Sequence, residues 1–235
     1  MNPFRKMVLA GLLSALMIPA TMEVAHASYY DTTFQVEAWT GPTGSSPSGV
    51  TDNASLSSMP TQSPLATFTY TGPIDFVNDN SAGGSNTYAN WFGKYASGIT
   101  NFKSADTLSQ FLATTMSTSN FGVSSYLSLT GYYDGSGAYV SVSHDDGASL
   151  YTISGKTITT VLSSPGPTSQ ITTTGFMSGP NSFDLIYVEA NGAPAVLTMS
   201  MTPEPSTWLL FATGIAGLLL FANRTRRSES ALGQN

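Results

Sequence analysis

Hydrophobic and polar residues alternate over most of the chain between residues 28 and 202. The alternating stretches are Thr33–Trp39, Leu65–Gly72, Ser125–Tyr133, Ala138–His144, Ser149–Ile153, Ser182–Ala190 and Ala195–Met201. They are rich in β-branched and aromatic residues, and Gly, Pro, Asn and Ser separate them, which is typical of half-buried strands joined by turns. The pattern predicts an all-β fold, an antiparallel β-sandwich.

One stretch has helical instead of alternating spacing. Leu108, Phe111 and Leu112 lie three and four residues apart within Ser104–Thr115, and Ser104 is a suitable N-cap. One short helix is therefore predicted in this stretch.

Two long stretches carry turn-forming residues and no periodic pattern. Residues 41–64 hold four prolines with much Ser and Gly, and residues 78–90 are rich in Asn, Ser and Gly. Loops of this length in a compact domain are often functional or disordered. No linker separates two cores, so we expect residues 28–202 to form one domain.

The first 27 residues have the organisation of a secretory signal peptide. Arg5 and Lys6 precede the apolar stretch Met7–Ala20, and the small residues Ala25 and Ala27 follow it. The apolar stretch is too short for a comfortable membrane span. A basic start, an apolar stretch and a small-x-small site predict export with cleavage after Ala27.

The C-terminal end combines an apolar stretch with a basic cluster. Trp208–Ala222 is apolar throughout, and Arg224, Arg226 and Arg227 follow it closely. Extended by the residue before it, this stretch approaches the length that spans a bilayer, so a transmembrane helix is predicted over residues 207–222. The arginines are expected to stay on the cytoplasmic side, which places the body outside the cytoplasm.

This C-terminal end resembles the PEP-CTERM sorting signal of proteins that exosortases process. The resemblance rests on Pro203, Glu204 and Pro205, the apolar span and the arginines after it. It implies recognition by an exosortase-type membrane peptidase and transferase, with transient anchoring in the inner membrane. It further implies transfer to the cell surface or extracellular matrix of a Gram-negative bacterium. A plain C-terminal anchor is the alternative.

The predicted body is acidic and has no cysteine. Residues 28–202 hold eleven acidic and three basic residues, an excess of eight negative charges. Binding to nucleic acid is excluded because no basic surface is available to neutralise phosphates. The absence of cysteine excludes disulfides and thiolate metal sites.

The strongest local signal is the stretch Gly135–Ile158, in which two alternating segments flank Asp145, Asp146 and Gly147. Asp-Gly between two strands is a common hairpin turn and requires no ligand. The stretch also resembles the core motif of the PA-fourteen family, the protective-antigen-type, lectin-like β-sandwich of bacterial toxins, glycosidases and adhesins. The matching positions are Gly137, Ala138, Tyr139, Val140, Val142, Asp145, Asp146, Gly147, Ser149, Leu150, Tyr151, Ile153, Gly155 and Lys156, whereas His144 replaces the usual serine.

The resemblance to the PA-fourteen family carries an expectation about metal binding. In its adhesin branch, two adjacent aspartates joined by a cis peptide bond bind Ca²⁺, and the ion holds sugar hydroxyls. The resemblance therefore implies a calcium site at Asp145 and Asp146, with Asn191 or Glu189 opposite them. Ca²⁺ takes about six to eight oxygen ligands, and two carboxylates supply the charge. Other members use the aspartate pair structurally, and this alternative stays open.

Aromatic residues give a second carbohydrate signal. Trp39, Trp91, Tyr132 and Tyr133 offer flat rings on which sugar C–H faces could stack. Core packing is the ordinary role of such residues, and we expect it for Trp91. Tyr133 and Glu189 are the ligand-binding candidates beside the metal candidates.

Little in the body indicates catalysis. His144 is the one histidine left after export, so neither a histidine-based triad nor a three-histidine zinc site fits. The acids do not single out a glycosidase pair. We therefore expect an exported, non-enzymatic protein that binds envelope or exopolysaccharide glycans, with Ca²⁺ as the one expected cofactor. A structural surface or biofilm-matrix component without a ligand site is the alternative, and a divergent glycosidase is the third possibility.

Overall fold

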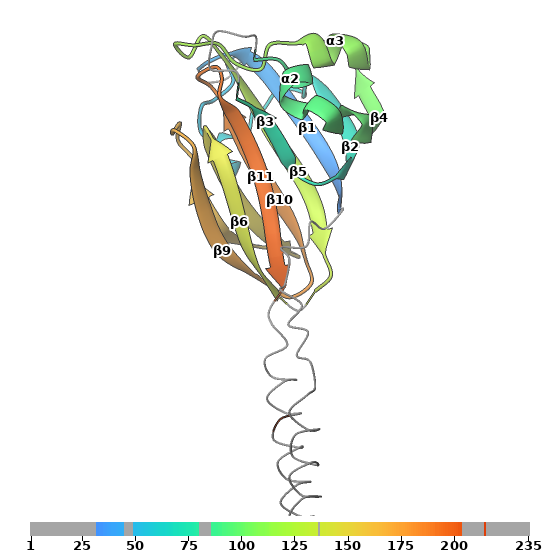
Figure 1. Ribbon diagram of the computed structural model, residues 1–235, viewed down its shortest axis with the longest axis vertical. Coiled ribbons are helices and arrows are strands. Elements are labelled where there is room, and N and C mark those ends of the chain that lie inside the picture. Colours follow the sequence, from blue (N-terminus) through green and yellow to red (C-terminus); the bar gives the residue numbers. More distant parts are fainter. Residues whose placement is uncertain (1–31, 45–48, 80–85, 136, 204–213, 215–235) are drawn as a thin grey trace, which may run out of the picture.

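Two antiparallel sheets, packed face to face, form the body of the protein in a computed structural model (Figure 1). The structure describes residues 32–44, 49–79, 86–135, 137–203 and 214. The strands are β1 (Thr32–Pro42), β2 (Ala66–Gly72), β3 (Asp75–Asn78), β4 (Ile99–Ser104), β5 (Val123–Tyr133), β6 (Gly137–Asp145), β7 (Gly147–Ser154), β8 (Thr157–Ser164), β9 (Ile171–Ser178), β10 (Asn181–Glu189) and β11 (Ala195–Pro203). One sheet has the order β4-β2-β1-β5-β10-β7-β8, and the other has the order β3-β11-β6-β9. The predicted β-sandwich is confirmed.

Seven strands coincide with the alternating stretches of the sequence, and four were not predicted. The four are β3, β4, β8 and β9, which are the outer strands of the two sheets. An edge strand buries less of its surface, so its sequence alternates less clearly. Five of the eight residues of β8, for example, are exposed.

The predicted helix is α3 (Leu108–Ala113), and it begins later than the sequence suggests. Thr107 is the N-cap, not Ser104: the Thr107 side chain accepts a bond from the Gln110 backbone N–H at 3.3 Å, and the Gln110 side chain accepts from the Thr107 N–H at 2.8 Å. This reciprocal pair is a capping box. Ser104 ends β4 and donates to the Leu65 carbonyl at 2.7 Å.

Both predicted loops contain short helices. The first holds η1 (Leu56–Ser58), and the second runs into α2 (Tyr88–Phe92), which continues as η2 (Gly93–Gly98). The described part of the first loop covers a small core on the outer face of the larger sheet. This core contains Trp39, Val50, Ala54, Tyr126, Tyr151, Ile186, Val188 and Ala190. This part of the loop therefore has a packing role.

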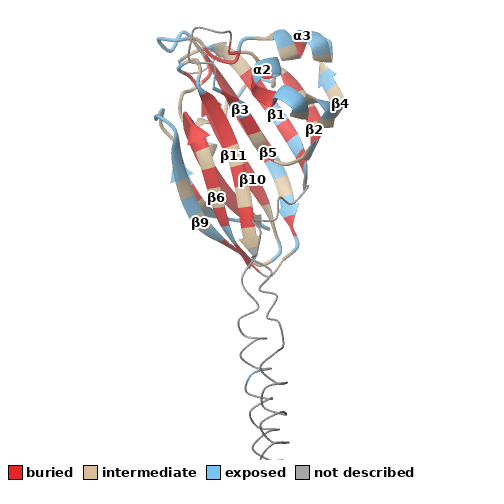
Figure 2. Cartoon of the chain, in the orientation of Figure 1, coloured by how far each residue is buried: buried red, intermediate tan, exposed pale blue. Residues whose placement is uncertain are grey.

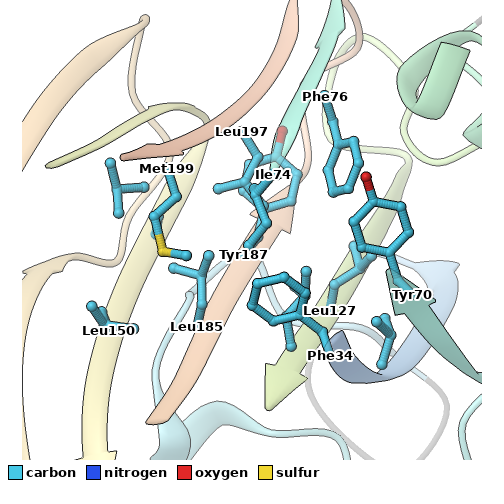
Figure 3. Packing of buried hydrophobic residues seen from close by; sticks show 14 of the residues in the cluster. Phe34, Tyr70, Ile74, Phe76, Leu127, Leu150, Leu185, Tyr187, Leu197 and Met199 are labelled. Carbon is cyan, nitrogen blue, oxygen red and sulfur yellow. The ribbon is translucent and has the colours of Figure 1, made fainter. Parts of the chain in front are cut away.

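The main core fills the space between the two sheets (Figures 2 and 3). Phe34 and Tyr70 come from the larger sheet and meet Phe76 and Leu197 from the smaller one. Full burial of each such side chain contributes about 1.5–3 kcal/mol to the free energy of unfolding. Trp91 is buried in this core, as predicted, and α2 supplies it.

Three direct connections between the two sheets lie at one pole, the upper end in Figure 1: one joins β8 to β9, and the other two follow β6 and β10. First, β6 ends at Asp145 in the smaller sheet, and β7 begins at Gly147 in the larger one. Second, β10 ends at Glu189 in the larger sheet, and β11 begins at Ala195 in the smaller one. The hairpin reading of Asp146-Gly147 is therefore wrong, because the strands on either side belong to different sheets. We call this end the crossing pole.

The opposite pole is where the described body meets both terminal segments. β1 begins there at Thr32 and β11 ends there at Pro203 (Figure 1). No helix within the described residues is long and apolar enough to cross a membrane. The predicted signal peptide at residues 1–27, the predicted transmembrane helix at 207–222, and Glu204, Pro205, Arg224, Arg226 and Arg227 lie outside the described residues.

The first crossing requires glycine at position 147, because a Cβ there would collide with the backbone carbonyl of Pro165. We expect Gly147→Ala to lower the free energy of unfolding by about 1–3 kcal/mol, as overpacking of a filled site does. Gly166→Ala is the matched control, since no atom lies within 4 Å of its added Cβ. Urea denaturation of both variants measures the difference, and equal losses would contradict the steric explanation.

Candidate functional site

The two crossings line an open cleft of about 420 Å³ at the crossing pole, together with Phe121 and residues 167–169 of the connection from β8 to β9. Asp145 and Asp146 line it from the first crossing, and Asn191 and Gly192 line it from the second. The three predicted metal candidates, Asp145, Asp146 and Asn191, are thus brought together by the fold. The peptide bond between Asp145 and Asp146 is cis, and so is the bond between Ala193 and Pro194.

The Asp146 carboxylate ties the two crossings to each other. Its Oδ2 accepts hydrogen bonds from the backbone N–H groups of Ala190 at 2.9 Å and Asn191 at 3.1 Å. Burial raises the pKa of this carboxyl above its ordinary value, and the backbone N–H groups act in the opposite direction. Asp146 therefore holds the second crossing in place as well as facing the cleft.

Fewer hydrogen bonds from backbone N–H groups stabilise the charged form of Asp145 than that of Asp146. Burial, followed by the charge of Asp146, raises the pKa of Asp145 to about 6, against a hydrogen bond from the Gln170 backbone. Within the described chain, the groups that act on these two carboxyls are other acids and backbone N–H groups, and no Lys or Arg is among them. Two neighbouring buried carboxyls without a basic partner form an environment that a cation would stabilise.

His144 supports the cleft from inside the sandwich. Its Nδ1 lies 2.6 Å from the Asp146 carbonyl oxygen, and its Nε2 lies 3.1 Å from Thr173 Oγ1. A carbonyl only accepts, so Nδ1 carries the hydrogen and Nε2 accepts from the threonine hydroxyl. Burial lowers the pKa of His144, which favours this neutral form. The histidine is fully buried and fixes the backbone of Asp146.

Glu189 does not line the cleft, so its prediction as a ligand-binding residue is wrong. The side chain is fully buried. Its Oε1 accepts from Ser117 Oγ at 2.7 Å and from Asn86 Nδ2 at 3.2 Å, and its Oε2 lies 2.9 Å from the Tyr187 hydroxyl. The sequence could not predict this burial. Glu189 is the last residue of β10, and the alternation of the strand does not show whether its side chain faces the core or the solvent.

The hydrogen-bond pattern assigns a proton to Glu189. The Tyr187 hydroxyl has one hydrogen, and it donates to the Asp145 carbonyl. Its contact with Glu189 Oε2 is therefore satisfied only if Oε2 carries a hydrogen and donates to the tyrosine oxygen. Burial, then the nearby Asp146 charge, raises the pKa of Glu189 well above its ordinary value, in agreement with a neutral carboxylic acid.

The predicted aromatic candidates lie away from the cleft. Tyr133 is buried at the end of β5, at the opposite pole, and its hydroxyl donates to the Gly137 carbonyl at 2.8 Å, so its prediction as a ligand-binding residue is wrong. Trp39 is buried under the first loop and donates from Nε1 to the Gln62 carbonyl at 2.8 Å. The cleft aromatic is Phe121, which is 42% exposed. The one feature of the sequence that could have identified Phe121 is its position as an apolar residue within a polar turn segment.

A metal ion in the cleft would depend on oxygen ligands of several kinds. Among the described residues, no group of three or more His, Cys, Asp or Glu side chains is arranged to hold a metal. The two carboxylates would therefore need amide, carbonyl, water or ligand oxygens to complete a shell. Ca²⁺ accepts such a mixed set, whereas a structural zinc site requires about four nitrogen or sulfur ligands.

Comparison with known proteins gives a result for the C-terminal end. Residues 202–227 match the family model described as the PEP-CTERM protein-sorting motif. The chain carries a PEP-CTERM sorting motif. The matched range contains all the predicted sorting residues: Pro203, Glu204, Pro205, Arg224, Arg226 and Arg227. The motif implies export and membrane-anchored sorting.

Solved structures similar to this one include two PA14 domains. The PA14 sugar-binding domain from an RTX adhesin is 17% identical, with 72% of this chain and 89% of that chain covered and a TM-score of 0.49. The PA14 domain of the MpAFP antifreeze protein is 17% identical, with coverage of 73% and 81% and a TM-score of 0.47. A GH31 α-xylosidase from Xanthomonas citri is 8% identical, with coverage of 77% and 16% and a TM-score of 0.40. No curated protein matches the chain.

The proton on Glu189 can be tested by comparing stability across pH. A carboxyl with a raised pKa in the folded state binds its proton more tightly there than in the unfolded chain, so its contribution to stability is lost as pH rises above the unfolded value. Glu189→Gln keeps the hydrogen-bond pattern without titrating. We expect it to match the parent chain near pH 4 and to exceed it in melting temperature at neutral pH.

The control for this comparison is Glu189→Leu. It leaves the Ser117 and Asn86 donors unpaired and should cost about 1–3 kcal/mol at every pH. If Glu189→Gln is instead less stable than the parent at neutral pH, the buried group is a carboxylate.

Proposed function

We propose that this chain is an exported, sorted envelope or matrix protein whose body binds glycan non-catalytically through a Ca²⁺ ion in the cleft at the crossing pole. The observation that carries the proposal is the placement of Asp145 and Asp146 side by side in a cleft whose other wall holds Asn191. These residues come from two segments more than forty positions apart and line the same cleft.

Calcium suits the ligand set better than other common metals. The cleft offers hard oxygen ligands, with carboxylates on one wall and the Asn191 amide on the other. Cysteine is absent from the whole chain, and His144 is already bonded through both ring nitrogens. Mg²⁺ prefers a tight octahedral shell and keeps several waters, whereas Ca²⁺ tolerates an irregular shell with neutral oxygens.

Glycan recognition follows from the open side of such a site. Two carboxylates and one amide fill only part of a calcium shell, so positions remain for a pair of vicinal sugar hydroxyls. Thr168 and Ser169 add hydroxyl groups to the wall of the cleft, and the exposed Phe121 ring offers an apolar face for sugar C–H groups. The acidic body would disfavour polyanionic polymers unless the cation intervenes.

The position of the cleft agrees with a surface-presented binding protein. β11 begins beside the cleft and ends at the opposite pole, where the sorting motif begins. A strand of its nine residues separates the two by about 30 Å. A chain held at its C-terminal end would therefore present the cleft away from the membrane.

Calcium binding is testable by thermal denaturation with and without millimolar Ca²⁺. We expect Ca²⁺ to raise the melting temperature, since ligand at about 100 times its dissociation constant adds about 2.7 kcal/mol. Asp145→Asn should abolish the rise. Asp134→Asn is the matched control, because Asp134 is an exposed aspartate after β5 at the opposite pole and should leave the rise unchanged. An equal rise in all three chains would count against the cleft.

Glycan binding is testable by a glycan array with and without a calcium chelator. We expect binding that disappears with chelator and in Asp145→Asn, but persists in Asp134→Asn. A blank array together with a calcium-dependent melting shift would favour a structural component stabilised by the ion. Release of reducing sugar from polymers would instead support a glycosidase.

A further inference from the structure

Among the described residues, the pole next to the start of the sorting motif carries four of the seven exposed large hydrophobic side chains. Tyr132 and Tyr139 are each 60% exposed, Ile158 is 56% exposed, and Phe176 is 41% exposed. Each lies within the last three residues of its strand at this pole: near the ends of β5 and β9 and the starts of β6 and β8. We call these four residues the apolar belt.

The belt surrounds the pole because both sheets contribute to it. Tyr139 and Phe176 are paired across β6 and β9 on the smaller sheet, and their rings meet edge to face at 5.1 Å. Tyr132 and Ile158 belong to the larger sheet. A buried residue adjoins each belt residue of β5, β6 and β9, so these side chains point away from the core, and Ile158 lies between two exposed threonines.

The short segment between the body and the apolar stretch limits how far the belt can lie from the membrane. Tyr139 pairs with Thr202, one residue before Pro203, where the described body ends. Five residues then lead to Trp208, where the apolar stretch of the sorting segment starts. Five extended residues span at most ~18 Å. While the apolar segment is in the bilayer, the pole with the belt is therefore held next to the membrane surface.

The chemistry of the belt suits the interface of a bilayer. Tyrosine places an apolar ring with a polar tip at the level of the headgroups. Interfacial side chains enter about 5–10 Å into the boundary between headgroups and acyl chains. The nearby turns carry one exposed charge of each sign, Asp134 and Lys156, so they add no net repulsion.

We propose that the apolar belt docks the body on a phospholipid bilayer while the sorting segment is still attached, and so fixes the body upright with the crossing pole outward. The occupant is the lipid interface itself. This inference depends on the sorting segment and not on calcium or glycan binding in the cleft.

The test uses the full chain, which has no cysteine and so accepts a single introduced label. Ile158→Cys and Ile171→Cys are a matched pair, because both replace an exposed isoleucine near the start of an edge strand, at opposite poles. Each carries a polarity-sensitive fluorophore in vesicles of phosphatidylethanolamine and phosphatidylglycerol that contain lipid-attached quenchers. We expect several-fold stronger quenching at position 158 than at position 171.

A second variant separates docking from tethering. This variant is the Ile158→Cys chain with three further substitutions, Tyr132→Ser, Tyr139→Ser and Phe176→Ser. We expect it to lose most of the quenching. Its melting temperature should stay close to that of the labelled parent. The Asp145→Asn change should leave the quenching intact, which keeps this test independent of the cleft.

Three results would overturn the proposal. Equal quenching at both positions would mean that the body tumbles freely on its tether. Quenching at position 158 that survives the triple substitution would mean that proximity alone causes it. Protection of the label that rises with protein density in the vesicle, without lipid quenching, would assign the belt to contacts with a second copy of this chain.

Discussion

Burial of one face of each sheet against the other is the constraint on which the rest of the structure depends. The two sheets share one apolar core, so the chain has to leave one sheet and enter the other as it adds strands. Three of these passages, after β6, β8 and β10, occur at the same pole. Because the strands around them pack into this core, the positions of the cleft residues follow from the packing of the two sheets.

A connected set of buried hydrogen bonds makes the cleft an extension of that core. Gly192 N–H donates to Ser117 Oγ at 3.0 Å, and Ser117 donates in turn to Glu189. Asn86 joins them from the segment before α2, with 2.6 Å between its Nδ2 and Ser117 Oγ. Buried polar groups are stable only when paired, and every member of this set has a partner. The set therefore stiffens the backbone that faces the cleft.

The sequence predicts the inner strands well and the site only in part. β1 alternates between exposed and buried residues from Thr33 to Ala38, whereas β8 and β9 have weaker patterns because most of their residues are exposed. The aspartate pair was identifiable from its motif. The partners of Asp146 were not, because backbone N–H groups carry no sequence signal. The burial of Glu189 could not be predicted either. It depends on Ser117, which is distant in sequence, and on Tyr187, whose inward orientation follows from the strand register.

The stacking of Trp91 on Tyr187 has a consequence for observing the protein. The two rings lie nearly parallel, at 6° and 5.3 Å between centroids, and the same tyrosine hydroxyl holds the Asp145 carbonyl. The indole is thus two contacts from the cleft but shielded from water. A displacement of the Asp145 backbone would be transmitted through the phenol and would alter the near-ultraviolet spectrum of the indole. Trp91 is therefore an intrinsic spectroscopic probe of conformational change in the cleft.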